Sequence, residues 1–285
     1  MSASAPYPAP KVLVFDSGLG GLTVFRELQA LRPQAEYLYL ADDAAFPYGR
    51  HAPDVVISRV EAVMGTAIAA FQPDAVVIAC NTASTLVMGP LRAKWPNVPF
   101  VGTVPAIKPA AAQTKSGMFS VLATPGTVAR DYTHDLVRQF AERCDVELVG
   151  SKRLASLAEA FMHGEAVDDA DIWAEIAPCF VAQDWRRTDV IVLACTHYPL
   201  LLAAFERLAP WPVTWIDSGN AIARRADHVL NERFAAGAAS STAGPGRSAF
   251  ALTSGAKPSL KLWAVLQGYE FLSVAECVVE FAALP

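Results

Sequence analysis

The stretch VIVLACTHYPLL, residues 190–201, runs through five apolar residues and then stops at a cysteine, a threonine and a histidine. An earlier stretch has the same form. DAVVIAC at 74–80 matches DVIVLAC at 189–195 in length, in the leading aspartate and in the closing cysteine. Short apolar, β-branched runs of this kind are typical of buried parallel strands. Each stretch therefore predicts a strand that ends in a thiol with polar neighbours.

Similar apolar runs recur along the chain, and segments with the period of amphipathic helices lie between them. The predicted strands cover residues 12–15, 37–40, 75–79, 100–101, 119–123, 146–149, 190–194, 213–216 and 250–253. The predicted helices cover residues 22–31, 54–71, 85–94, 127–143, 155–163, 169–183, 199–208, 222–234 and 259–266. A strand followed by a helix, many times over, predicts a doubly wound α/β architecture with parallel sheets and right-handed crossovers. The segment 236–247, rich in Ala, Gly and Ser, is expected to be a surface loop.

The order of the polar turns along the chain suggests two similar halves. In the first half, one strand ends at 16–18 (DSG) and a later one at 80–82 (CNT). In the second half, one strand ends at 124–127 (TPGT) and a later one at 195–197 (CTH). Each half thus has a Gly-containing polar turn and then a cysteine turn. We interpret this as a pair of pseudo-symmetric α/β units that face each other.

The composition excludes several classes of protein. The net charge is −5, from 23 Lys and Arg against 28 Asp and Glu, and no basic stripe is present, which argues against nucleic acid or an anionic membrane as a partner. The five cysteines form no C-x-x-C pair and no zinc-site spacing, so no metal is expected. The first residues, MSASAPYPAPK, lack the pattern of a secretory signal, and no apolar run is long enough to span a bilayer. We therefore expect a cytoplasmic protein with reduced thiols.

Polar side chains gather where the predicted strands end, which is where open parallel sheets bind their ligands. These strand-end residues are Asp16, Ser17, Cys80, Asn81, Thr82, Thr124, Thr127, Cys195, Thr196 and His197. The backbone N–H groups at the start of each following helix can bind a carboxylate without Lys or Arg. The pattern therefore favours a small acidic ligand held by neutral donors.

Cys80 and Cys195 are the sharpest chemical signal among these residues. Taken singly, each is more often a small core residue, but the two share matched strands, matched positions and polar neighbours. A thiol with a pKa near 8.5 is only about 3% thiolate at pH 7, and a following helix N-terminus is expected to lower that pKa. Two thiols on opposing halves suit a carbon acid that loses its proton to one sulfur and regains a proton from the other, with inversion. Asp16 is then the proton-handling partner of Cys80. His197, together with Glu159, serves Cys195.

Six blocks of the sequence resemble, in the family's order, the signature blocks of the glutamate racemases, the cofactor-independent enzymes that supply D-glutamate for bacterial peptidoglycan. The blocks are VFDSGLGGLTV (14–24), DDAAFPYG (42–49), IACNTAST (78–85), GTVPAIKPA (102–110), ATPGTV (123–128) and LACTHYPLL (193–201). Any one block is moderately specific, but six in order are highly specific.

This resemblance implies two α/β domains with the active site between them. Residues 1–102 plus 217–285 form the first domain and residues 103–216 form the second. Cys80 and Cys195 are implied as the two acid/base residues, with no cofactor. The implied contacts to the substrate, glutamate, are Asp16, Ser17, Tyr48, Gly49, Asn81, Thr82, Thr196 and His197. Glu159, in LASLAEA, sits where the family carries an active-site acid, by a looser alignment.

Other functions stay open at this level. The same fold would serve a racemase of aspartate or hydantoin, or a one-cysteine decarboxylase, although the paired cysteines disfavour the decarboxylase. A two-lobed amino-acid binding protein could clamp the same ligand, but it would not need two reactive thiols. No lysine has an evident Schiff-base setting for pyridoxal phosphate, and GLGG at 18–21 does not fit the dinucleotide fingerprint. Some members of the family are regulated by a cell-wall precursor, and the sequence allows either a monomer or a homodimer.

Overall fold

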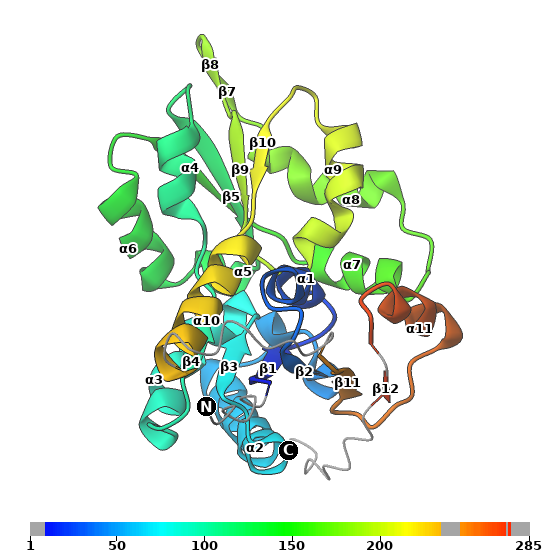
Figure 1. Ribbon diagram of the computed structural model, residues 1–285. Coiled ribbons are helices and arrows are strands. Elements are labelled where there is room, and N and C mark those ends of the chain that lie inside the picture. Colours follow the sequence, from blue (N-terminus) through cyan, green and yellow to red (C-terminus); the bar gives the residue numbers. More distant parts are fainter. Residues whose placement is uncertain (1–8, 235–245, 272, 275–285) are drawn as a thin grey trace, which may run out of the picture.

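Two parallel sheets organise the molecule (Figure 1). The computed structural model describes residues 9–234, 246–271 and 273–274, so most of the predicted loop at 236–247 lies outside the described residues. The first sheet has six strands in the order β12-β11-β2-β1-β3-β4, and the second has four in the order β10-β9-β5-β6. All pairings within these two sheets are parallel, which confirms the predicted doubly wound α/β class.

The first sheet lies between two helical layers. Its strands are β1 (Lys11–Asp16), β2 (Glu36–Ala41), β3 (Ala75–Ile78), β4 (Phe100–Gly102), β11 (Ser248–Leu252) and β12 (Ser273–Val274). Its helices are α1 (Leu22–Leu31), α2 (Pro53–Phe71), α3 (Asn81–Lys94), α10 (Gly219–Phe234) and α11 (Leu260–Gln267). Alternate residues of β1 enter opposite cores, because successive side chains of a strand point to opposite faces. Val12 and Val14 pack in one core with α1, α10 and α11, whereas Leu13 and Phe15 pack in the other with α2 and α3.

The second sheet is built in the same way. Its strands are β5 (Met118–Ala123), β6 (Asp145–Gly150), β9 (Val190–Leu193) and β10 (Thr214–Ile216). Its helices are α4 (Ile107–Gln113), α5 (Pro125–Val128), α6 (Asp131–Phe140), α7 (Leu154–Met162), α8 (Asp169–Ile176) and α9 (Leu202–Leu208). Ile191 and Leu193 of β9 face a core with α7, α8 and α9, and Val190 and Val192 face one with α4 and α6. Both faces of β9 are therefore buried, which explains its uninterrupted apolar run.

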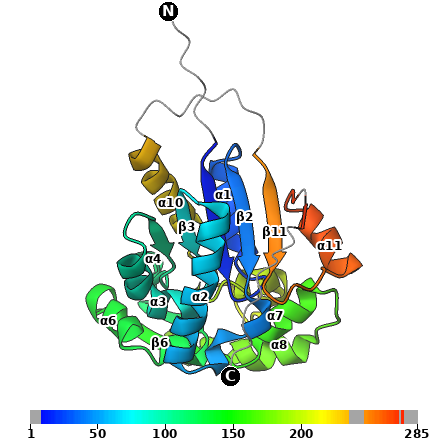
Figure 2. The same cartoon turned by 90° about the horizontal axis from the view of Figure 1, so that it is seen from below.

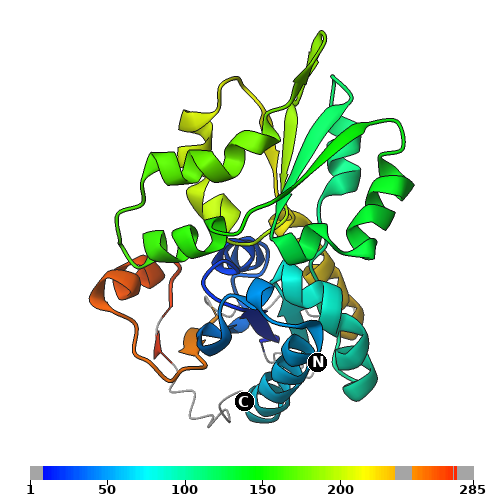
Figure 3. The same ribbon diagram turned by 180° about the vertical axis from the view of Figure 1, so that it is seen from behind.

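The chain leaves the first sheet and later returns to it. Figure 2 shows β11 beside β2, and the pairing of Ser248 with Tyr37 confirms the contact. The second sheet takes its strands from the intervening residues 118–216, seen as the green and yellow upper half of Figure 3. We propose on this basis that the domain boundaries lie near residues 103 and 217, with α10 belonging to the first domain.

The structure differs from the prediction in several helices. The single helix expected at 127–143 is two helices, α5 and α6, because Thr133 Oγ1 donates to Thr127 O at 2.7 Å and turns the chain. The helix expected at 169–183 ends at Ile176. A 3₁₀ turn, η3 (Ala177–Cys179), and the hairpin β7 (Ala182–Gln183) and β8 (Arg186–Arg187) follow it. The short helix α4 was not predicted from the sequence. Pro109 lies in its first turn, where a proline is tolerated.

Candidate active site

One narrow cavity lies where the carboxyl ends of the strands from both sheets meet. It is lined by Ser17, Phe46, Pro47, Tyr48, Gly49, Cys80, Asn81, Thr82, Thr124, Ala155, Cys195, Thr196 and His197. The structure thus brings together most of the residues selected from the sequence, including both cysteines, one from each sheet. Asp16, Glu159 and Thr127 stand outside this set, and each is hydrogen-bonded to a residue that lines the cavity.

The Cys80 end of the cavity is formed by β3 and α3. Cys80 is the N-cap of α3, and its Sγ accepts a hydrogen bond from Ala83 N at 3.5 Å. Ser17 Oγ lies 3.6 Å from the same sulfur. Burial raises the pKa of the Cys80 thiol to about 12. The charge of Asp16 adds to the increase, and the hydrogen bonds from Ala83 and Ser17 oppose it. The helix N-terminus does oppose the increase through Ala83 N, but desolvation outweighs this donor, so the expected net lowering of the pKa is wrong.

Asp16, at the end of β1, connects the two halves of the site. Its Oδ1 accepts from Gly18 N at 2.9 Å, and its Oδ2 accepts from Thr196 Oγ1 at 2.8 Å. The side chain is fully buried, and burial raises the pKa of this carboxyl, while His197 and the hydrogen bond from Thr196 oppose the increase. Asp16 therefore holds the cysteine turn of the second half in register with the first half.

The Cys195 end is built differently. A 3₁₀ turn, η4 (Tyr198–Leu201), follows the cysteine in place of an α-helix, and Cys195 Sγ lies 3.9 Å from His197 Nδ1. The other ring nitrogen, Nε2, is 3.3 Å from Glu159 Oε1. Burial alone would lower the pKa of His197. The hydrogen bonds to Cys195 and Glu159 outweigh burial and raise the pKa well above its ordinary value. The ring is therefore set up to carry a positive charge between a sulfur and a carboxylate.

The turn between β1 and α1 receives contacts from the second half. Leu19 N donates to Glu159 Oε1 at 2.8 Å, and Gly20 N lies 3.3 Å from His197 Nε2. A Cβ on Gly18 would overlap Glu159 Oε1, and a Cβ on Gly20 would overlap the His197 ring. Glycine is needed at both positions because side chains from the opposite sheet approach the backbone so closely.

Neutral donors surround the rest of the cavity. Thr124 Oγ1 lies 3.1 Å from both Thr82 Oγ1 and Thr127 Oγ1, so three hydroxyls form a chain across the two sheets. Asn81 Nδ2 is buried and has no hydrogen-bond partner among the described residues. A buried amide N–H without a protein partner is available to a bound ligand. These groups suit the carboxylates of a small amino acid.

The loop at 42–49 contributes residues that the sequence analysis did not single out. Phe46 and Pro47 line the cavity, and the Phe46 ring centroid lies 5.3 Å from that of His197. The hydroxyl of Tyr48, a predicted substrate contact, donates to Asp42 Oδ2 at 2.5 Å, and Asp42 does not line the cavity. Tyr48 therefore offers the cavity its ring and backbone. The block DDAAFPYG was a signal for this loop, but it did not reveal which way the tyrosine points.

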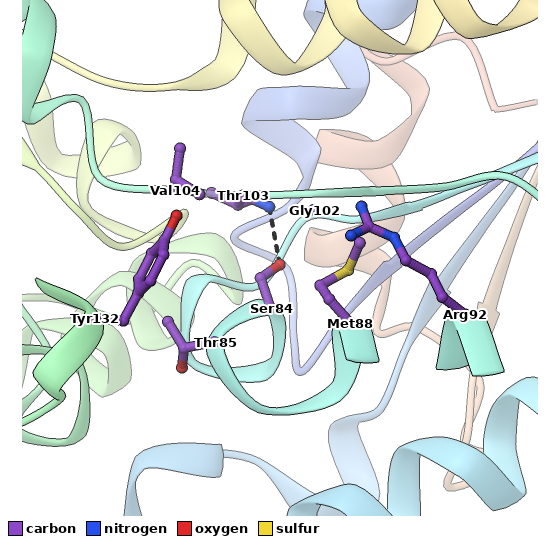
Figure 4. A pocket seen from close by; sticks show the side chains of 8 residues that line it. All are labelled: Ser84, Thr85, Met88, Arg92, Gly102, Thr103, Val104 and Tyr132. Atoms are coloured by element: carbon purple, nitrogen blue, oxygen red, sulfur yellow. Dashed lines mark hydrogen bonds between the residues drawn. The ribbon is translucent and has the colours of Figure 1, made fainter. Parts of the chain in front are cut away.

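A second pocket lies beside the same helix α3 (Figure 4). Its empty volume is about 730 Å³, counting its open mouth. It is lined by Ser84, Thr85, Met88 and Arg92 of α3, by Gly102 at the end of β4, by Thr103 and Val104 after β4, and by Tyr132 of α6. Thr103 N donates to Ser84 Oγ at 2.9 Å, which joins α3 to the strand end. One turn of α3 thus separates this pocket from Asn81 and Thr82 in the first cavity.

The described part of the chain offers no group of three His, Cys, Asp or Glu side chains that could hold a metal ion. None of its helices is long and apolar enough to cross a membrane.

Comparison with known proteins gives a consistent result. Residues 23–226 match the family described as Asp/Glu/Hydantoin racemase. A glutamate racemase of Brucella anthropi is 57% identical over 232 residues, which cover 81% of this chain and 82% of that protein. The crystal structure of Escherichia coli glutamate racemase in complex with L-glutamate and the activator UDP-MurNAc-Ala superposes with a TM-score of 0.83 at 38% identity. The match covers 94% of this chain and 97% of that one. A glutamate racemase from Bacillus anthracis gives a TM-score of 0.75 at 25% identity, over 94% and 97% of the two chains.

Proposed function

The chain belongs to the Asp/Glu/hydantoin racemase family, and from this premise we propose that it interconverts L- and D-glutamate by a two-base mechanism that needs no cofactor. The observation that carries the proposal is the presence of Cys80 and Cys195, from separate sheets, in the wall of one cavity. Two sulfurs placed in this way can act on opposite faces of a single α-carbon. A two-base racemisation uses that geometry, because one sulfur removes the α-proton from one face and the other delivers a different proton to the opposite face.

The substrate is held by neutral donors. We assign its carboxylates to the Asn81 amide, the backbone N–H groups of the Cys80 and Cys195 turns, and the hydroxyls of Thr82 and Thr124. Thr127 lies outside the cavity and acts through Thr124, and the hydroxyls of Ser17 and Thr196 donate to Asp16 instead. The backbone of the Tyr48-Gly49 segment completes the contact. Fixing both carboxylates leaves the α-carbon little freedom to rotate between the sulfurs.

A two-base reaction needs one sulfur as the base and the other as the acid. Cys80 is a thiol at neutral pH, because its pKa is about 12. An imidazolium at His197 stabilises negative charge on Cys195, and Glu159 stabilises the imidazolium. In one direction the Cys195 thiolate removes the α-proton, and the Cys80 thiol then donates its proton to the opposite face of the carbanion. This leaves a thiol at Cys195 and a thiolate at Cys80, which Ala83 N and Ser17 Oγ stabilise by hydrogen bonds.

The reverse direction starts from the form with a thiolate at Cys80 and a thiol at Cys195. Cys80 is then the base and Cys195 the acid. Asp16 can take a proton from Cys80 through Ser17, whose Oγ lies 3.5 Å from Asp16 Oδ1. The raised pKa of Asp16 suits this role, because a carboxyl with a raised pKa holds a proton more readily at the operating pH.

Isotope exchange tests the proposal against its alternatives. Single enantiomers of glutamate, aspartate and alanine are incubated with the protein in D₂O, and α-deuterium and optical rotation are followed together. We expect exchange with loss of optical activity for glutamate alone. Exchange confined to aspartate would assign the activity to another racemase of the family. Tight glutamate binding without exchange would indicate a two-lobed binding protein.

We propose that the enzyme acts in the cytoplasm and that its product, D-glutamate, is used for peptidoglycan synthesis. Reduced thiols at both ends of the cavity are necessary for the mechanism, and a reducing compartment keeps them in that state. A strain that depends on external D-glutamate should lose that dependence when it expresses this chain.

We also propose regulation by a cell-wall precursor, because the E. coli relative holds UDP-MurNAc-Ala as an activator together with its substrate. An activator that is bound together with the substrate must occupy a site outside the active-site cavity. The pocket on α3 offers one, since Arg92 can meet an anionic group and the helix that carries Arg92 begins at the Cys80 turn (Figure 4). Addition of UDP-MurNAc-Ala should raise kcat/KM for glutamate, and the Arg92→Met variant should lose this response. Equal rates with and without the precursor would reject the regulatory proposal.

A further inference from the structure

Asp42 and Arg59 form a buried ion pair that the mechanism above does not use. Both side chains are buried, and three residues, Arg59, Tyr48 and Thr253, donate hydrogen bonds to the Asp42 carboxylate. Its Oδ1 accepts from Arg59 Nη2 and from Thr253 Oγ1, each at 2.5 Å. Its Oδ2 accepts from Arg59 Nε at 2.9 Å and from Tyr48 OH at 2.5 Å. A carboxylate has about four lone-pair sites, so every acceptor site of Asp42 is occupied.

This network joins segments that are far apart in the sequence. Arg59 belongs to α2, and Thr253 directly follows β11, 211 positions after Asp42. Next to the network, Asp43 Oδ1 accepts from Ser254 N at 2.9 Å, and Thr253 N donates to Ala41 O at 3.0 Å. The segment after β11 therefore anchors the beginning of the loop that follows β2.

The opposite side of that loop forms part of the active-site cavity. Phe46, Pro47, Tyr48 and Gly49 all line it. Phe46 packs on His197 with ring centroids 5.3 Å apart, and a Cβ on Gly49 would touch Thr124. The loop thus lies between the Asp42 network and side chains of the second sheet, and Tyr48 is the residue that belongs to both sides.

We propose that Asp42 and Arg59 are positioning residues for the reaction, which rests on the racemase function proposed above. Neither residue lines the cavity, so they act through the loop. The pair and the Thr253 hydroxyl fix the Tyr48 ring and the Tyr48-Gly49 backbone against the substrate. A buried ion pair is weak evidence for stability in itself, because desolvation offsets most of its Coulomb attraction. Its connection to a cavity-lining tyrosine gives it a role in binding.

The Thr253→Val variant tests the proposal with the smallest change to the structure. It removes the hydroxyl that donates to Asp42 Oδ1, together with its longer contacts to Asp43 Oδ1 and Ala44 N, and changes the shape of the side chain little. Asp42→Asn would instead remove the charge that pairs with the buried Arg59 and is expected to impair folding. Thr253→Ser keeps the hydroxyl and is the rescue variant. Thr66→Val, at an exposed position on α2, is the matched control for the same substitution. Two quantities are measured for each variant: the steady-state kinetics with L- and D-glutamate, and amide hydrogen exchange of residues 42–51 without substrate.

In Thr253→Val we expect KM to rise about fivefold in both directions with kcat within about twofold, because a static binding contact is weakened. The loop amides should exchange faster, and Thr253→Ser and Thr66→Val should behave as the unmodified protein. Unchanged exchange of the loop amides, unchanged KM, a loss confined to kcat, or a lower melting temperature with intact kinetics would each overturn the proposal. If the unmodified protein does not racemise glutamate, the proposed function fails, and the amide exchange still decides whether the network holds the loop.

Discussion

The strand ends at Cys80 and Cys195 are alike in sequence and unlike in surroundings. Cys80 caps an α-helix beside a buried aspartate, and within the described part of the chain its sulfur is contacted by the backbone N–H of Ala83 and the hydroxyl of Ser17. Cys195 precedes a 3₁₀ turn, and its sulfur faces a histidine that is paired with Glu159. The matched strands place the two sulfurs in one cavity, while the residues around each sulfur decide how it handles a proton. In the proposed mechanism, an asymmetric pair of bases therefore acts in two mirror-image directions.

Replacing either cysteine with serine tests whether both ends are needed. A serine hydroxyl is a far poorer base than a thiolate, so Cys80→Ser and Cys195→Ser should each reduce racemisation by about 10³-fold or more. Circular dichroism of glutamate measures the rate. If one of the two variants kept near-normal racemisation, that sulfur would not be an acid/base group and the comparison of the two ends would fail.

The neighbours of the sulfurs should act on opposite directions of the reaction. Asp16→Asn removes the proton acceptor linked to Cys80 through Ser17, and His197→Asn removes the cation beside Cys195. Each variant should lower kcat by about 10²-fold in the direction that uses its own cysteine as base, and less in the other direction. KM should change in the same proportion, because the two enantiomers have equal free energy and kcat/KM must stay equal in the two directions. Initial rates at saturating pure L- and pure D-glutamate give the two kcat values. Equal slowing of both directions by Asp16→Asn would assign Asp16 to substrate positioning.

Gly18 and Gly20, in the turn between β1 and α1, should not tolerate a side chain. A methyl group on Gly20 would displace the His197 ring, so Gly20→Ala should lower kcat/KM about tenfold or more. Gly126→Ala is the control, because a Cβ there meets no atom within 4 Å. Similar kinetics for the two variants would show that the turn does not hold the histidine in place.

The charge on His197 should also appear in the pH dependence of stability. Because its folded-state pKa is raised, the stabilisation by His197 is fully present below the unfolded pKa of about 6.5 and is lost as the pH rises through the folded value. The difference in melting temperature between the unmodified protein and His197→Gln should therefore be larger at about pH 6 than at about pH 10, by a few degrees. A difference that grows with pH would mean that the ring is neutral in the folded protein.

The sequence predicted most of the strands and the convergence of polar residues, because short β-branched runs and strand-end polar residues are local signals. It could not predict the asymmetry of the two ends. The burial that raises the pKa of Cys80 comes from residues far apart in the sequence. The sequence indicated that a helix starts after Cys80, but it did not indicate how completely the thiol is shielded from solvent. The sequence also did not predict the Asp42 network, because Arg59 and Thr253 come close to Asp42 only in the folded chain. Glu159 was chosen from a loose alignment, and its contact with His197 depends on the packing of α7 against the glycine turn.

Enantiomer-resolved exchange in the serine variants tests the central claim most directly. Cys80→Ser and Cys195→Ser are each incubated with pure L- or pure D-glutamate in D₂O, and loss of the α-proton signal is followed by proton NMR. If the sulfurs face opposite sides of the α-carbon, each variant exchanges one enantiomer, and the two variants prefer opposite ones. Preference for the same enantiomer by both variants would contradict the account.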